Sequence, residues 1–270
     1  MNIAPILITV GFSFICAAVQ ARASVHWHAS VEQANEDAIE TSRPIWIEFY
    51  AEWCAPCKQM EKEVYSSPEF EQASARFLLV RIDVDKENAA ARKYNVITLP
   101  TIVFADSYGN ELFRHAGYLG AQPLLEVAAA LPGNVAEFNR WNRILSADRN
   151  NFDALIGLGD ALREAKLYRA SIEYYVRALQ RHEGRTNLDK REAILNHLGL
   201  NFLTLRDAKH AAAIFEKCLK EFPNSSRKGE WMLHLGEAYS LGDKNDRQKA
   251  RTLHHGLIPA VPQVGNRPER

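Results

Sequence analysis

Two cysteines separated by two residues, Cys54 and Cys57, are the residues of this 270-residue sequence best suited to chemistry. They lie in the segment Trp53-Cys54-Ala55-Pro56-Cys57, which follows an apolar run and opens a stretch with a helical pattern. This spacing lets both sulfurs reach bonding distance across the first turn of a helix. The unpaired N–H groups and partial positive charge of a helix N-terminus favour the thiolate of Cys54. The pattern therefore predicts dithiol–disulfide exchange, with Cys54 as the attacking sulfur and Cys57 as the resolving one.

Metal binding is the alternative chemistry for these residue types. A Cys-x-x-Cys pair can supply half of a zinc site, but the sequence has no second such pair, and Cys218 lies in a different region. His26 and His28 would share a face of an extended segment and could hold a metal, or could simply flank Trp27 as a packing and surface pair. We expect redox chemistry at the cysteine pair, an inert buried thiol at Cys218, and no metal or organic cofactor.

The cysteine pair needs a strand before it and a helix after it, and the surrounding sequence predicts both. Runs rich in β-forming residues predict strands at 45–50, 77–84, 101–105 and 111–115, the last two joined by a hairpin turn at 108–110. Helical patterns cover 30–41, 57–64, 89–94 and 122–131, and the residues 66–68 mark the end of the second of these. This order predicts an α/β fold with a central sheet and helices on both faces.

Residues 44–131 resemble a thioredoxin domain, because Trp-Cys-Ala-Pro-Cys-Lys is close to that family's Trp-Cys-Gly-Pro-Cys-Lys. The resemblance implies that Leu99-Pro100-Thr101 is the cis-proline loop that faces the cysteines and offers its backbone to a bound substrate. It also implies that Glu48, six residues before Cys54, takes the place of a buried Asp that accepts the proton of the resolving thiol. Arg81 stands where many members have a Lys near that carboxylate.

The same resemblance places Trp53 and Pro56 with Leu99, Pro100 and Thr101 in the substrate-binding surface. It also has departures, since Ala55 replaces Gly and Glu48 replaces Asp. The helix before the first strand, with Glu61, Tyr65 and Ser67-Pro68 beyond the motif, looks more like extracytoplasmic relatives, including the C-terminal domain of membrane-bound disulfide-interchange reductases. In that setting a similar domain can reduce, oxidise or isomerise disulfides.

The residues beside Glu48 also indicate its role independently of the resemblance. Its neighbours Ile47 and Phe49 are apolar, which indicates burial, and burial would raise its pKa and suit it to accept a proton. Arg81 would oppose that shift if the two side chains meet. The alternative is that Glu48 is simply a tolerated acid at the end of a strand.

The N-terminus resembles a secretory signal. No charged residue occurs from residue 3 to residue 19, and Ala21-Arg22-Ala23 fits a cleavage site before Ser24. We predict a signal peptide at 1–23 and a periplasmic or otherwise extracytoplasmic location, with an uncleaved membrane anchor as the alternative.

Helical repeats are predicted after the α/β domain, which we bound at 24–131. Three segments share the spacing of apolar residues around a Leu-Gly pair, at Leu158-Gly159, Leu198-Gly199 and Leu235-Gly236. This is the tetratricopeptide pattern, stretched by longer turns, and it predicts an all-α repeat domain at 134–258. In this reading Tyr174, Tyr175 and Trp231 belong to the repeat core. Residues 259–270, with three prolines, are predicted to be a disordered tail.

Composition excludes several classes of protein. Apolar residues make up 47% and charged residues 24%, which excludes a disordered chain, and four cysteines are too few for a disulfide-stapled scaffold. The net charge is zero, yet residues 24–131 hold nine basic and 16 acidic residues, whereas residues 132–270 hold 23 basic and 17 acidic residues. A protein with one acidic half and one basic half is a poor candidate for a general nucleic-acid binder.

Taken together, the sequence predicts an exported thiol–disulfide oxidoreductase that acts on protein substrates, most simply as a reductase. The repeats would recruit a protein partner, and the positive charge of the second half could hold an acidic peptide or the acidic α/β half. No nucleic acid is expected as a partner, and a membrane only if residues 1–23 stay attached. The alternatives are an oxidase or isomerase that uses the same site, and a redox-switched scaffold without turnover.

Overall fold

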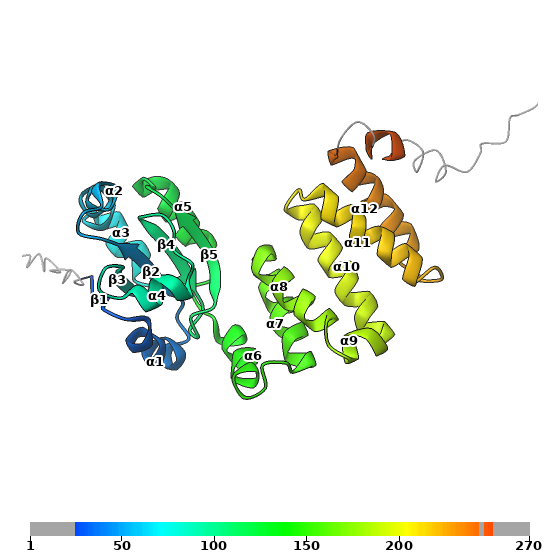
Figure 1. The fold of residues 1–270 in the computed structure, drawn as a ribbon, viewed down its shortest axis with the longest axis horizontal. Coiled ribbons are helices and arrows are strands. Elements are labelled where there is room, and N and C mark those ends of the chain that lie inside the picture. Colours follow the sequence, from blue (N-terminus) through cyan, green and yellow to red (C-terminus); the bar gives the residue numbers. More distant parts are fainter. Residues whose placement is uncertain (1–24, 243–245, 251–270) are drawn as a thin grey trace, which may run out of the picture.

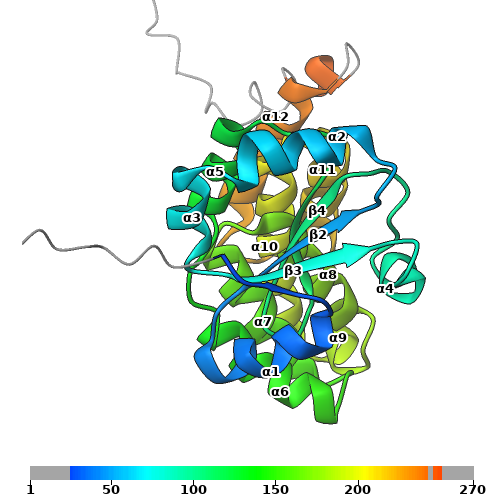
Figure 2. The ribbon, with the colours of Figure 1, turned by 90° about the vertical axis from the view of Figure 1, so that its left-hand side faces the viewer.

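The computed structural model describes residues 25–242 and 246–250. The predicted signal peptide at 1–23 and the predicted tail at 259–270 lie outside the described residues. The described chain forms an α/β part, residues 27–130, followed by a helical part, residues 136–242 (Figure 1). Figure 2 looks onto the α/β part, with the helical part behind it. The predicted fold class, an α/β domain followed by helices, is confirmed.

A mixed five-stranded sheet forms the centre of the α/β part. Its strands are β1 (Trp27–His28), β2 (Ile45–Tyr50), β3 (Leu78–Asp83), β4 (Thr101–Ala105) and β5 (Glu111–Ala116). The spatial order is β1-β3-β2-β4-β5, so β2 is central, parallel to β3 and antiparallel to β4. Its residues from Ile45 to Phe49 are all buried, because a central strand covered on both faces needs a nearly continuous apolar run.

Helices cover both faces of this sheet, as predicted. They are α1 (Val31–Thr41), α2 (Ala55–Met60), the π-helix η1 (Glu61–Tyr65), α3 (Pro68–Ser74), α4 (Asn88–Lys93) and α5 (Ala121–Ala130). On one face, α1 packs its small residues Ala34 and Ala38 against Ile47 and its neighbours. On the other face, residues of α2, α3 and α5 surround Trp46 and Phe104.

The structure differs from the sequence prediction around Ser67. The segment 66–68 was read as the end of a helix, and the helix α3 that begins there was missed. The Ser67 side chain accepts a hydrogen bond from the backbone N–H of Phe70, 3.2 Å away, and Pro68 occupies the first turn. Ser followed by Pro therefore caps the start of a new helix here. The two-residue strand β1 was also missed, because so short a segment carries no periodic signal.

The helical part consists of paired helices, the first pair preceded by a single helix. Its elements are α6 (Ala136–Ala147), α7 (Phe152–Glu164), α8 (Tyr168–Leu179), α9 (Glu183–Thr186), α10 (Leu188–Thr204), α11 (Ala208–Glu221) and α12 (Lys228–Leu241). A side chain at Gly159 would collide with the ring of Tyr175, and one at Gly199 with the ring of Phe215. The glycines thus let α7 approach α8, and α10 approach α11. The short helix α9 accounts for the long connection between these two pairs.

A buried polar network joins α6 to the α/β part. The carboxylate of Asp106 accepts hydrogen bonds from the side chains of Asn142, at 2.8 Å, and Asn110, at 3.0 Å. Next to it, the hydroxyl of Ser107 accepts from the side chain of Asn139 at 3.1 Å. All of these groups except Asn110 are almost fully buried, and separation of α6 from the α/β part would remove the bonds to Asn142 and Asn139, while Asp106 and Ser107 would keep their bonds within the α/β part.

Candidate active site

Cys54 and Cys57 are joined by a disulfide bond at the N-terminus of α2. The turn after β2 places Cys54 as the N-cap residue of that helix, and its Sγ accepts a hydrogen bond from the backbone N–H of Cys57 at 3.2 Å. Pro56 lies in the first turn, where its missing N–H leaves no gap in the helix. This is the geometry that the spacing of the two cysteines predicted.

The disulfide lies at the base of an exposed apolar surface. Cys57 is 1% exposed and Cys54 is 3% exposed, whereas Trp53 beside them is 69% exposed. Leu99 packs against the two cysteines, and Ile97, two residues before it, is 88% exposed. A thiol or disulfide of another protein can therefore reach Cys54 only by docking against this surface.

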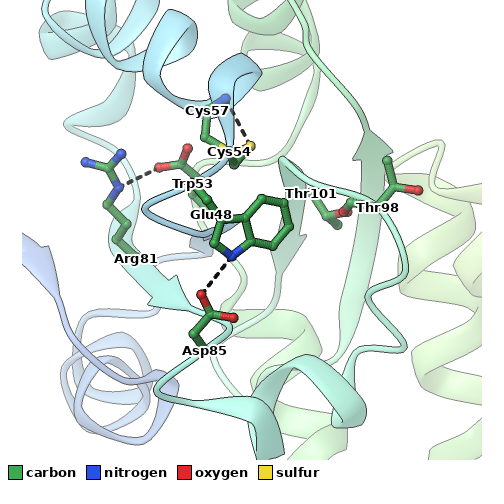
Figure 3. The surroundings of a disulfide bond; sticks show 8 residues. All are labelled: Glu48, Trp53, Cys54, Cys57, Arg81, Asp85, Thr98 and Thr101. Atoms are coloured by element: carbon green, nitrogen blue, oxygen red, sulfur yellow. Dashed lines mark hydrogen bonds and ion pairs between the residues drawn. A yellow bond between two sulfur atoms is a disulfide. The ribbon is translucent and has the colours of Figure 1, made fainter.

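Trp53 is held by a residue that sequence reasoning missed. Its indole N–H donates to the carboxylate of Asp85 at 2.9 Å (Figure 3). Asp85 follows the end of β3, and Trp53 follows the end of β2, its parallel neighbour. Because the carboxyl ends of parallel strands meet at the same edge of a sheet, this order along the chain could have pointed to Asp85.

Glu48 is fully buried in β2 and points toward the cysteine pair (Figure 3). Burial raises the pKa of Glu48 to about 7, although the nearby Arg81 works in the opposite direction. A carboxyl with that pKa exchanges its proton near neutral pH, which is the property a proton acceptor for a thiol needs.

Arg81 connects Glu48 to the surface. Its Nε lies 2.9 Å from Oε2 of Glu48, although its N–H is not aimed at that oxygen, and its other nitrogens reach Glu61. The guanidinium also lies over the ring of Tyr50, with 4.4 Å between Cζ and the ring centroid. Glu61 is the first residue of the π-helix η1, and its side chain is 49% exposed. Glu48 therefore has one counter-ion, which it shares with a partly solvated carboxylate.

The loop before β4 contains the predicted proline. The peptide bond between Leu99 and Pro100 is cis. The carbonyl of Pro100 already accepts from the N–H of Gly117 at 2.7 Å, and the hydroxyl of Thr101 donates to the carbonyl of Thr98 at 2.6 Å. Thr101 is buried and paired within the sheet. Among the described residues, no hydrogen bond is formed by the backbone groups of Leu99 or of Ile97, so the open backbone of this loop lies at these two residues, and Leu99 is the one that packs against the cysteines.

The remaining candidates lie apart from this site. The rings of His26 and His28 are 5.0 Å apart, and Trp27 between them packs against Phe70. The described residues contain no group of three or more His, Cys, Asp or Glu placed to hold a metal ion. Cys218 is buried in α11, and burial raises the pKa of its thiol to about 12. None of the helices in the described segments is long and apolar enough to span a membrane.

The comparison with known families agrees with the fold and the cysteine pair. Residues 31–131 match the model of a family described as a thioredoxin-like domain. The α/β part of this protein is therefore a thioredoxin-like domain, with the Cys-x-x-Cys pair at its helix N-terminus.

Individual relatives match part of the chain. Over 100 residues the chain is 33% identical to the thiol:disulfide interchange protein DsbD of Pectobacterium atrosepticum, and over 90 residues it is 38% identical to DsbD of Yersinia pestis. These alignments cover 35% and 31% of this chain, but only 17% and 15% of the relatives' lengths. Among solved structures, a DsbH oxidoreductase matches with 23% identity and a TM-score of 0.37, over 44% of this chain and 93% of the other.

Proposed function

We propose that this protein is an exported thiol–disulfide oxidoreductase that reduces disulfides in protein substrates. The observation that carries the proposal is the disulfide between Cys54 and Cys57 at a helix N-terminus, with the buried carboxyl of Glu48 pointing toward it. The likeness of residues 31–131 to thioredoxin-like domains, and to proteins named for thiol:disulfide interchange, supports the same chemistry.

The reaction begins with the dithiol form of the site. The thiolate of Cys54, stabilised by the N–H groups at the start of α2, attacks one sulfur of a substrate disulfide and releases the other as a thiol. The thiolate of Cys57 then attacks Sγ of Cys54 in this mixed disulfide. The substrate leaves with both sulfurs reduced, and Cys54 and Cys57 are joined as in the structure. A dithiol reductant must return two electrons to close the cycle.

Glu48 would serve the second step. Cys57 attacks only as a thiolate, so its proton must leave when the mixed disulfide forms. Glu48 is ionised above about pH 7, and its carboxylate can accept that proton at neutral pH. Arg81 stabilises the ionised form, and Glu61 shares this counter-ion.

Substrate chains would bind across the cysteine pair. The unpaired backbone of Leu99 can form hydrogen bonds with an extended segment of substrate, as an added strand does at the edge of a sheet. Trp53, fixed by Asp85, and the exposed Pro56 would contact its side chains. Pro100 and Thr101 would act by holding Leu99 in place, since their own polar groups are already paired.

The remaining segments of the chain would direct the protein to export and bind a protein partner. The uncharged segment before Ser24 supports export and cleavage of residues 1–23, with residues 24–131 as the redox domain. The helix pairs of the helical part, together with the recurring Leu-Gly pattern, support a tetratricopeptide-like array over 134–258 that recruits a protein partner.

The test uses the full mature chain, residues 24–270, with insulin as substrate and dithiothreitol as reductant. The parent protein should accelerate insulin reduction, Cys54→Ser should abolish that acceleration, and Cys57→Ser should accumulate mixed disulfides on Cys54. Cys218→Ser is the matched control, because a buried thiol in α11 should not affect the rate. Insulin reduction that is no faster than with dithiothreitol alone would reject the enzyme.

The reduction potential of the cysteine pair tests whether the site reduces or oxidises its substrates. Equilibration with glutathione should give a value near that of thioredoxin, about −270 mV, for a reductase. A value well above this would instead assign the same site to oxidation or isomerisation.

A further inference from the structure

The helical part has a hollow of about 600 Å³ between its two helix pairs, away from the cysteine site. It lies between the start of α8 and the turn that joins α10 to α11. Its lining residues are Arg169, Ile172, Phe202, Leu205, Arg206, Asp207, Ala208 and Lys209. The hollow therefore combines three cations with an apolar floor.

The cations occupy corresponding positions in the two helix pairs. Arg169 is the second residue of α8, and Lys209, 40 residues later, is the second residue of α11. Arg206 and its counterpart Lys166 stand in the turns before these helices, and both have a left-handed backbone, with φ values of 58° and 62°. Two successive turns thus present their positive side chains along the same edge of the helical part.

These cations are only weakly neutralised among the described residues, since Asp207 is the one carboxylate of the lining and Arg169 is the last of the causes that lower its pKa. Within residues 25–242 and 246–250, Arg169, Arg206 and Lys209 form no ion pair. The single carboxylate in the lining, Asp207, caps the start of α11 by accepting from the N–H of His210 at 3.2 Å. Its other oxygen lies 2.8 Å from the ring of His210. The hollow is therefore positive at neutral pH.

A second hollow in the helical part differs in its charge. It measures about 330 Å³ and lies between α7 and α10, where Lys190 pairs with Asp153 and His197 lies 3.3 Å from Asp160. Because its lining holds two carboxylates, Asp153 and Asp160, against the single cation Lys190, it offers no such preference for an anionic ligand.

The floor of the positive hollow suits an apolar side chain. Leu205 is 36% exposed, and Ile172 and Phe202 are only partly covered. The ring of Phe202 stacks on the ring of His210, with 5.1 Å between the centroids, and also packs against the core of the helical part. The ring is thereby held in place where it lines the hollow.

We propose that this hollow binds an acidic segment of a protein partner, with one apolar side chain inserted between Ile172 and Phe202. Carboxylates on either side of that residue would pair with Arg169, Arg206 and Lys209. A protein segment fits better than a long polyanion, because the adjoining α/β half carries an excess of seven acidic residues and would repel a nucleic acid. This inference deepens the recruiting role proposed above and does not depend on the redox reaction.

The test measures binding of a short fluorescein-labelled peptide of alternating Asp and Glu with one central Phe, by fluorescence anisotropy. The variant combines Arg169→Glu with Lys209→Glu. Both positions lie in the first turn of a helix, where an acidic residue is favourable, so the variant should fold. We expect binding to weaken about 10-fold or more. The matched control combines Arg143→Glu with Lys228→Glu, exposed cations outside the hollow, and should bind as the parent does.

A second peptide, with Ser in place of Phe, tests the floor without any change to the protein. It should bind several-fold more weakly than the Phe peptide, and this difference should persist at about 0.5 M salt, where charge contacts are screened. Equal binding of the two peptides would reduce the hollow to a plain anion site and overturn the proposal.

Other results would also overturn it. These are equal weakening in the control variant, tighter binding of a single-stranded oligonucleotide with the same dependence on Arg169 and Lys209, and a dimer of the chain that the variant dissociates. Anisotropy does not involve the disulfide, so failure here is distinguishable from failure of insulin reduction.

Discussion

Replacement of Glu48 by Gln should make the protein more stable at alkaline pH. In the folded protein, burial raises the pKa of Glu48 from its ordinary 4.5 to about 7. The unfolded chain therefore loses this proton at lower pH than the folded one, and stability falls as the pH rises from 4.5 through 7. Each pKa unit corresponds to about 1.4 kcal/mol, so the buried charge costs about 3 kcal/mol above pH 7.

Gln keeps the shape of the side chain and removes that cost. The gain at pH 8 has an upper bound of about 3 kcal/mol, because the variant also loses the ion pair with Arg81, which keeps its contact with Glu61. Near pH 4 the parent carboxyl is protonated in both states, and the difference should be small. Urea unfolding of the oxidised parent and variant at both pH values measures it.

Glu61→Gln provides the matched control, since Glu61 contacts the same arginine but is half exposed. It should give a much smaller gain at pH 8, because burial is the main cause of the raised pKa of Glu48 and the charge of Glu61 is a lesser one. A Glu48→Gln protein that is less stable than the parent at pH 8, or that differs from it equally at both pH values, would show that Glu48 is not a buried acid with a raised pKa.

The same substitution should slow turnover. Without a proton acceptor, Cys57 remains a thiol for longer, so insulin reduction at pH 8 should fall about 10-fold or more and mixed disulfides should accumulate. In the parent, the rate should rise as the pH increases through 7, because Glu48 becomes ionised there. That step should be absent from the pH profile of Glu48→Gln, and its persistence would assign it to another group.

Two further substitutions and one labelling experiment test packing in the helical part and at its junction with the α/β part. Gly199→Ala should lower stability by about 1–2 kcal/mol in urea unfolding, because the new Cβ would lie 2.8 Å from the ring of Phe215. Asn142→Ala should cost about 1–3 kcal/mol in the same assay, since it removes a hydrogen bond from the buried carboxylate of Asp106. Native Cys218 should stay unreactive toward iodoacetamide at pH 8 and react once urea unfolds the chain, because burial raises the pKa of its thiol to about 12.

Sequence patterns predicted the elements whose signals are local. The run from Ile45 to Tyr50 was predicted as a buried strand and forms the centre of the sheet. The helix after Cys54 was predicted to start near its observed first residue, but its change to a π-helix at Glu61 was not. The first residue of the π-helix, Glu61, pairs with Arg81 of β3, a tertiary contact that no spacing along the chain reveals.

The residues of the candidate site likewise fall into those that local sequence signals predicted and those that they did not. The positions of Cys54, Cys57 and Glu48 follow from a strand, a turn and a helix that are consecutive in sequence. Asp85 was missed because its contact with Trp53 joins two strand ends that are more than 30 residues apart. Similarly, the sequence could not single out Leu99 within its loop, since the partners of its neighbours lie elsewhere in the sheet.

The junction at α6 determines how a recruited partner would meet the cysteines. Asp106 and Ser107 would each lose one buried hydrogen bond if α6 separated from the α/β part, at a cost of about 1 kcal/mol for the bond to Ser107 and about 2 kcal/mol for the bond to the carboxylate. The helical part is therefore held on the redox domain during turnover. A partner bound in the hollow beside Arg169 and Lys209 would raise the effective concentration of its disulfide at Cys54. This holds only when the distance between its acidic segment and its disulfide matches the distance between the hollow and Cys54. A rigid junction thus makes recruitment selective for the geometry of the substrate as well as for its charge.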